Sequence, residues 1–174
     1  MKTYKITTSS RIISEMFESR GHSVSKDDIE TAIRECIVQN KSSLSVKDFK
    51  IVFVDKDSYK SISSDSENDV FICIGNKEIY PMPIHLPAEQ IFHIDYFMFN
   101  ISHHILVPKH ELLIRDSEKK KRSLFLAYLN IDESSQLPLL YTVDPVAKYY
   151  GMKNGDICKI TRPNYVSYRY VVRN

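Results

Sequence analysis

Apolar positions recur at helical spacing in two segments near the start of the chain. In the first, residues 12–17 carry four apolar side chains on one face after Ser9 or Ser10, either of which can cap the helix, and Gly21 ends it. In the second, which begins at Ser25, apolar residues through Ile37 share one side. The pattern therefore predicts two amphipathic helices that pack as a pair.

Residues 41–48 are mostly polar and are interpreted as a connection, after which the pattern changes to short runs of β-branched and aromatic residues. Phe49–Asp55 is typical of a strand buried on both faces, and Val70–Ile74 indicates a second one. The residues between these runs have the Ser/Asp composition of a loop. Three prolines within residues 81–87 exclude a helix and predict an extended connector. Ile91–Ile105 is rich in β-formers and predicts one or two further strands.

The last part of the chain contains both helix-like and strand-like spacing of apolar residues. Val107-Pro108 predicts an edge strand, and Ser117–Leu129 predicts a helix with Leu124, Phe125 and Tyr128 or Leu129 facing inward. Leu139–Val143 is typical of a short strand.

The segment 143–162 has the most explicit local signals. Asp144 can cap a helix whose first position is Pro145, and Gly151 ends that helix. A turn at 154–156 leads into a strand at 157–162, which pairs with a strand at 165–172. The whole pattern predicts an α+β fold: a mixed α/β domain at 1–100 and a small α+β domain at 101–174 that ends in a β-hairpin.

Composition excludes several classes of function. The chain has 174 residues, is 43% hydrophobic and carries a formal net charge of +2, which is too small for nucleic-acid binding over a large surface, so any contact with DNA must be local. Four glycines exclude Gly-rich phosphate loops. Cys36, Cys73 and Cys158 lie in apolar patterns and are expected to be buried free thiols. These features, and the absence of an 18-residue apolar run, predict an intracellular protein without a cofactor.

Four sequence segments resemble a known family: NISHHILVPKH at 100–110, Gln136-Leu137-Pro138, DPVAKYYGMKNGDICKITR at 144–162, and SYRYVV at 167–172. They are similar to the fifth-largest subunit of eukaryotic RNA polymerases, whose C-terminal half is similar to a small subunit of the archaeal polymerase. The resemblance implies a non-catalytic subunit for transcription. Residues 1–100 would form a jaw domain near downstream double-stranded DNA. Residues 101–174 would form an assembly domain that docks on the largest subunit.

The chain departs from the family pattern in two places. Its jaw domain is shorter than in the family, and the hairpin at 162–165 lacks a longer Ser/Thr/Gly-rich loop, so the contacts of that loop are in question. A short jaw in a chain rich in Lys, Asn, Ile and Ser indicates a large DNA virus or an A+T-rich eukaryote. The expected location is the nucleus for a cellular polymerase, and the host cytoplasm or the virion for a viral one.

The residues expected at the subunit interface come from the matching segments. Strand alternation predicts that some basic residues of the hairpin share an exposed side that faces an acidic partner segment, and tyrosines are common at interfaces. The alternative is that Pro108 only starts a strand, that His110 is a satisfied polar residue and that half of the tyrosines fill the core. The interface candidates are Pro108, Lys109, His110, Asp144, Pro145, Tyr149, Lys159, Arg162, Tyr168 and Arg169.

Other chemistry fits the sequence less well. His103, His104 and His110 are poor metal ligands, because adjacent residues of a strand point to opposite faces and no cysteine or carboxylate has suitable spacing nearby. Residues 119–122, which are Lys-Lys-Lys-Arg, fit a solvated helix start better than a phosphate site.

Two alternative functions remain. A Mg²⁺-dependent nuclease would use the Asp48-Phe49-Lys50 segment with Asp69, but Asp48 and Lys50 precede the buried strand in which that motif should lie, and Asp55 has no matching lysine. A free-standing DNA-binding module is disfavoured by the near-neutral charge and by the absence of a recognition-helix signature.

Overall fold

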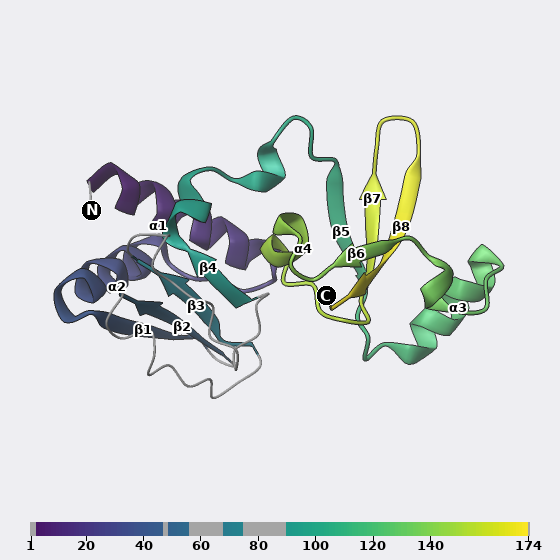
Figure 1. Ribbon diagram of the computed structural model, residues 1–174, viewed down its shortest axis with the longest axis horizontal. Coiled ribbons are helices and arrows are strands. Elements are labelled where there is room, and N and C mark those ends of the chain that lie inside the picture. Colours follow the sequence, from purple (N-terminus) through teal and green to yellow (C-terminus); the bar gives the residue numbers. More distant parts are fainter. Residues whose placement is uncertain (1–2, 47–48, 56–67, 75–89, 174) are drawn as a thin grey trace. The chain divides into compact units, whose positions relative to one another are not determined.

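A computed structural model describes residues 3–46, 49–55, 68–74 and 90–173 (Figure 1). The chain divides into two compact units, Met1–Asn100 and Ile101–Asn174. Most of the predicted Ser/Asp-rich loop and the proline-rich connector lie outside the described residues. Within the described parts, no helix combines the length and the apolar character needed to cross a membrane. The observed elements confirm the predicted α+β fold class.

Two helices open the first unit, α1 at Thr3–Ser19 and α2 at Lys26–Gln39. The predicted start of the first helix was wrong, because Ser9 and Ser10 lie inside α1, where the Ser10 hydroxyl donates to Thr7 O at 3.1 Å. The predicted cap of the second helix is confirmed: Ser25 Oγ accepts from Asp27 N at 3.2 Å. Gly21 ends α1 as predicted, with a φ of +86°.

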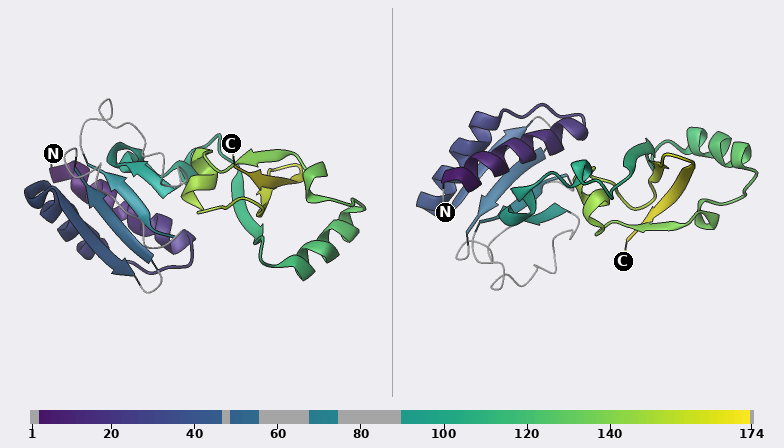
Figure 2. Two further views of the ribbon diagram at one scale, coloured as in Figure 1. Left: turned by 60° about the horizontal axis from the view of Figure 1, so that its bottom comes forward. Right: turned by 90° about the horizontal axis from the view of Figure 1, so that it is seen from above.

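A four-stranded sheet completes this unit, in the order β1 (Lys41–Val46), β2 (Phe49–Val54), β3 (Val70–Cys73), β4 (Ile91–His93). β1 is antiparallel to β2, while β2, β3 and β4 run parallel. Both helices lie on one face of this sheet (Figure 2). The core includes a stack of the Phe17 and Phe49 rings, whose centroids are 5.2 Å apart.

Two predictions in this unit were wrong. β1 was interpreted as a polar connection, yet it pairs with β2 along all six residues. The run after Ile91 has only three strand residues and continues in 3-10 turns at Ile94–Met98 and Ile101–His103. His93 Nδ1 caps the first of these turns by accepting from Asp95 N at 3.2 Å, so local capping overrides the β propensity of the run.

The second unit is built around a sheet in the order β5-β7-β8-β6. Its β5–β7 and β7–β8 pairs are antiparallel, which confirms the C-terminal hairpin, and β6 is parallel to β8. Helix α3 follows β5 along the chain, and the short α4 follows β6. The bounds are β5 Lys109–Ile114, α3 Lys119–Leu129, β6 Leu139–Tyr141, α4 Pro145–Tyr149, β7 Ile157–Thr161 and β8 Val166–Val172.

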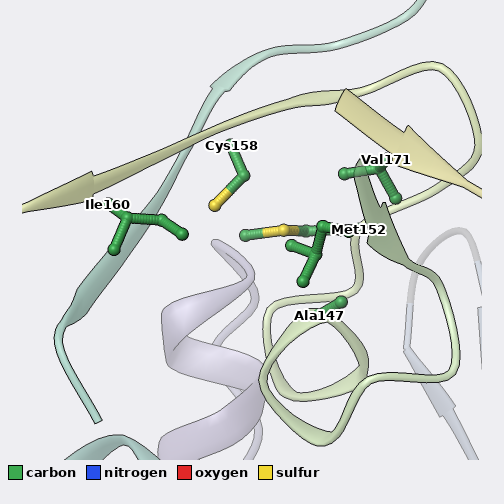
Figure 3. Close-up of a cluster of buried hydrophobic side chains, with 6 residues drawn as sticks. Ala147, Met152, Cys158, Ile160 and Val171 are labelled. Atoms are coloured by element: carbon green, nitrogen blue, oxygen red, sulfur yellow. The ribbon is translucent and has the colours of Figure 1, made fainter. Parts of the chain in front are cut away.

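Each face of this sheet carries its own apolar cluster. On the α4 face, the side chain of Met152 lies between those of Ala147 and Cys158 (Figure 3). On the α3 face, Phe125 and Leu129 pack against a cluster centred on Ile157. The predicted inward face of α3 was partly wrong, because Leu124 and Tyr128 are exposed, 70% and 81% respectively.

Candidate interaction surface

Local backbone chemistry sets the shape of residues 144–156, which cover the α4 face of the sheet. Asp144 Oδ1 accepts from Val146 N at 2.8 Å and Ala147 N at 3.3 Å, and Pro145 occupies the first turn, as the sequence predicted. Gly151 has a φ of +60° and ends the helix. Asp144 and Pro145 therefore act at least as helix-capping residues.

A buried carboxylate fixes the end of this segment. Asp156 is 1% exposed and accepts from Arg115 Nη1 at 2.9 Å, Asp116 N at 3.0 Å and Lys153 N at 2.9 Å. It thereby ties the turn before β7 to the end of β5. Sequence reasoning missed this role, because an aspartate in a turn gives no signal that distinguishes a buried acceptor from a solvated one.

A second contact closes the same junction. Arg122 donates to Gly155 O and lies 2.8 Å from Asp116 Oδ1. Gly155 has a φ of +92°, and a Cβ there would lie 2.5 Å from Asp116 Oδ1. Lys119 also pairs with Asp116, and Lys121 pairs with Glu118. Three of the four consecutive cations at the start of α3 are therefore paired within the chain, which favours a solvated helix start over a phosphate site.

His110 lies on the α4 face, opposite Ile160. Its Nδ1 donates to Pro108 O at 2.7 Å, which ties the start of β5 to the residue before it. Burial lowers the pKa of this imidazole, and the positive charges of Arg162 and Arg169 lower it further, against opposing effects of the Pro108 carbonyl and Asp144. The neutral form of the ring is therefore favoured.

Arg162 and Arg169 lie on the same face as His110. Strand register places Arg169 opposite Cys158, and its Nη1 donates to Leu139 O at 2.9 Å. The Arg162 guanidinium lies 5.7 Å from the centre of the Tyr165 ring. Neither guanidinium pairs with a carboxylate of the described residues, and Arg162 Nε is buried without a hydrogen-bond partner among them. This face therefore offers two cations that an acidic partner could neutralise.

The other predicted cations lie on the opposite face of the sheet. Lys109 Nζ is 2.9 Å and Lys159 Nζ is 3.6 Å from the Glu111 carboxylate. The hydrogen bond from Lys109 is the main cause that lowers the pKa of Glu111. Tyr168 is opposite Lys159, and its ring packs edge-on against Phe125 at 4.9 Å. Of the four Lys and Arg residues predicted at the interface, only Arg162 and Arg169 therefore lie on the face of the sheet that carries His110.

Tyr149 is one of the largest fully buried side chains, so it presents no surface for a partner. The neighbouring Tyr150 is half-buried and hydrogen-bonds to Ser102, and burial is the main cause that raises the pKa of its hydroxyl. The interface candidates include Tyr149 and not Tyr150, because the helical pattern puts both on one face and does not indicate which of them stays accessible.

The residues of the nuclease alternative have ordinary structural roles where they are described. Asp69 is buried, and its carboxylate accepts from Lys50 N at 2.9 Å. Asp48 lies outside the described residues. In the described ranges, no three His, Cys, Asp or Glu residues are grouped so that they could hold a metal ion.

Comparison with known proteins confirms the family resemblance. Residues 99–172 match the family described as RNA polymerase Rpb5, C-terminal domain. The chain is 34% identical over 122 residues to a Dictyostelium discoideum protein named DNA-directed RNA polymerases I, II, and III subunit rpabc1, an alignment that covers 65% of this chain and 59% of that protein. Because that share of the chain exceeds the second unit, the similarity extends into the first.

Two further relatives match a smaller share of the chain. A subunit of RNA polymerases IV and V of Arabidopsis thaliana, named 5B, is 38% identical over 82 residues, or 47% of this chain and 35% of that protein. The RPABC1 subunit of RNA polymerases I, II, and III of Caenorhabditis briggsae is 40% identical over 80 residues, or 43% and 36% of the two chains. The chain therefore spans less than two thirds of the length of these relatives, and its match to the Rpb5 C-terminal domain covers residues 99–172.

Proposed function

We propose that this chain is a non-catalytic structural subunit of a multisubunit DNA-directed RNA polymerase. The observation that carries the proposal is the match of residues 99–172 to the Rpb5 C-terminal domain, since this covers nearly the whole second unit. The catalytic site and its metal ions belong to other subunits. The relatives give no support to the nuclease alternative.

The second unit would dock on the largest polymerase subunit through the face that carries His110, Arg162 and Arg169. Two guanidinium groups without a carboxylate partner in the described residues fit an acidic segment of that subunit. Pro108, Lys109, Lys159 and Tyr168 would contribute from the strand ends and the opposite face, while Asp144, Pro145 and Tyr149 would shape the surface from within.

The first unit would form part of the jaw around downstream DNA. This role rests on the family resemblance and on the alignment with the Dictyostelium protein, which reaches into this unit. With a net charge of +2, the chain would make only local DNA contacts. The protein would act inside the cell, in the nucleus for a cellular polymerase. Origin from a large DNA virus or an A+T-rich eukaryote, with the corresponding locations, stays a prediction.

Affinity purification of the tagged full-length chain from its native source tests the proposal. Recovery of the large polymerase subunits is expected, and recovery of the chain without them would reject the idea. A truncation tests the domain roles: residues 101–174 should suffice for incorporation, and residues 1–99 should not. Digestion of DNA by the pure protein with Mg²⁺ would instead favour a nuclease.

Substitution tests the proposed interface itself. The variant R162Q/R169Q should lower the recovery of the largest subunit, whereas K120Q, which removes an exposed cation of α3 in the same unit, should leave it unchanged. Because Arg169 also bonds to Leu139 O, the urea midpoint of each variant must be measured beside its recovery. Equal recovery of R162Q/R169Q and wild type would remove these residues from the interface.

A further inference from the structure

A turn at residues 104–107 presents two large aliphatic side chains to solvent. Ile105 is 95% exposed and Leu106 is 81% exposed, although the centre of a turn usually carries polar residues, Gly or Pro. Neither side chain belongs to either apolar cluster of the second unit. Their exposure is therefore unexplained by the stability of the domain.

The turn is held in one conformation by its own hydrogen bonds. Val107 N donates to His104 O at 2.9 Å and closes the turn. Leu106 N donates to His104 Nδ1 at 3.2 Å, so the imidazole satisfies a second backbone group. His104 N donates to Ile101 O at 3.2 Å, which joins the turn to the 3-10 turn before it.

Both ends of the turn are tied to the rest of the second unit. Before it, Ser102 hydrogen-bonds to the half-buried Tyr150 beside α4. After it, Pro108 O accepts from the buried His110, and β5 begins at Lys109. A side chain presented from a segment that is already ordered loses little conformational entropy on binding. This is the arrangement expected of residues that anchor an interface.

We propose that Ile105 and Leu106 are the apolar anchor of the subunit interface and insert into an apolar pocket of the largest polymerase subunit. The proposal rests on the proposed function and names two residues that are not among the interface candidates taken from the sequence. Two observations support this occupant. The turn is continuous along the chain with the proposed interface residues Pro108 and His110, and it lies within the residues that match the polymerase family.

The outer face of α3 provides a matched control. Leu124 and Tyr128 are 70% and 81% exposed, so their removal takes away similar apolar surface from the same unit without touching the turn. If any exposed apolar pair promoted capture by the polymerase, the two pairs would behave alike.

The test uses the tagged full-length chain expressed in its native source, with the amount of largest subunit recovered per tagged chain as the readout. The variant I105A/L106A should bind about 100-fold more weakly, since truncating each of two anchors costs about tenfold. L124A/Y128A should match wild type, and I105M/L106M, which keeps the apolar surface, should retain most of the binding. All three should keep the wild-type urea midpoint because the side chains are exposed.

The outcomes separate the anchor from the proposed function. Wild-type recovery by I105A/L106A would overturn the anchor while leaving the polymerase role intact. Equal losses in I105A/L106A and L124A/Y128A would also overturn it, as would loss of binding in I105M/L106M. If the wild-type chain itself recovers no polymerase subunit, both proposals fail.

Discussion

Replacement of Asp156 should destabilise the second unit more than any surface substitution, because its carboxylate is the shared acceptor at the junction of β5 and β7. In D156A the backbone N–H groups of Asp116 and Lys153 lose their acceptor, at about 1–3 kcal/mol each for a buried donor. Arg115 is 38% exposed at its side chain, so water can replace part of its ion pair. The expected loss is therefore about 4 kcal/mol, within the range for breaking a buried pair.

The isosteric D156N separates charge from shape. The amide oxygen can occupy the Oδ2 position and keep the bonds from Arg115 and Lys153, while its NH₂ group then faces Asp116 N. The backbone N–H of Asp116 then has no acceptor, so a loss of about 1–3 kcal/mol in the free energy of unfolding is expected. D132N, in an exposed position of the same unit, should change the stability by less than about 0.5 kcal/mol.

The assay is urea unfolding of the full-length chain, combined with hydrogen exchange read by mass spectrometry. Protection should fall in peptides that contain β5 and β7 and stay unchanged in those that contain β2. The reasoning would be refuted if D156A unfolded at the same urea concentration as D132N, or if the two units lost protection equally.

Three further predictions follow from capping and titration. D144A should lose about 1 kcal/mol of stability to urea, because two α4 amides lose their acceptor, and an unchanged midpoint would contradict the capping role. Burial lowers the pKa of His110, so the folded chain binds fewer protons than the unfolded chain and its stability should fall as the pH drops below about 6.5. In H110Q this part of the pH dependence of the melting temperature should disappear. The same pH dependence in H110Q and wild type would exclude His110 as its source. Burial raises the pKa of the Cys36 thiol to about 11 and that of Cys158 to about 12, so iodoacetamide at pH 8 should label both only in urea, and rapid labelling of the native chain would contradict their burial.

Local signals predicted the elements that depend on a few neighbouring residues. The predicted helix caps at Ser25 and Asp144 and the predicted helix end at Gly151 are confirmed. Each of these residues acts on backbone groups within three or four positions, which the local sequence specifies. The family segments predicted the match of residues 99–172 to the polymerase family, since these segments are long and occur in the right order along the chain.

Features that depend on distant partners escaped prediction. The strand Lys41–Val46 has little β propensity of its own and forms because β2 offers a pairing edge. Asp156 is an acceptor for residues about 40 positions earlier. The exposure of Leu124 and the burial of Leu126 depend on which side of α3 meets the sheet, which a weakly amphipathic helix does not specify.

The strand order of the second unit has a consequence for its synthesis on the ribosome. β5, the first strand of this sheet along the chain, pairs only with β7, and β6 pairs only with β8, the last strand of the sheet. Pairing between residues so far apart has a high entropic cost until the late strands exist. The sheet therefore forms only after β7 and β8 have left the ribosomal tunnel. A deletion of β8 alone would leave β6 without a partner and β7 paired with β5 only, so it should behave as the loss of the entire unit.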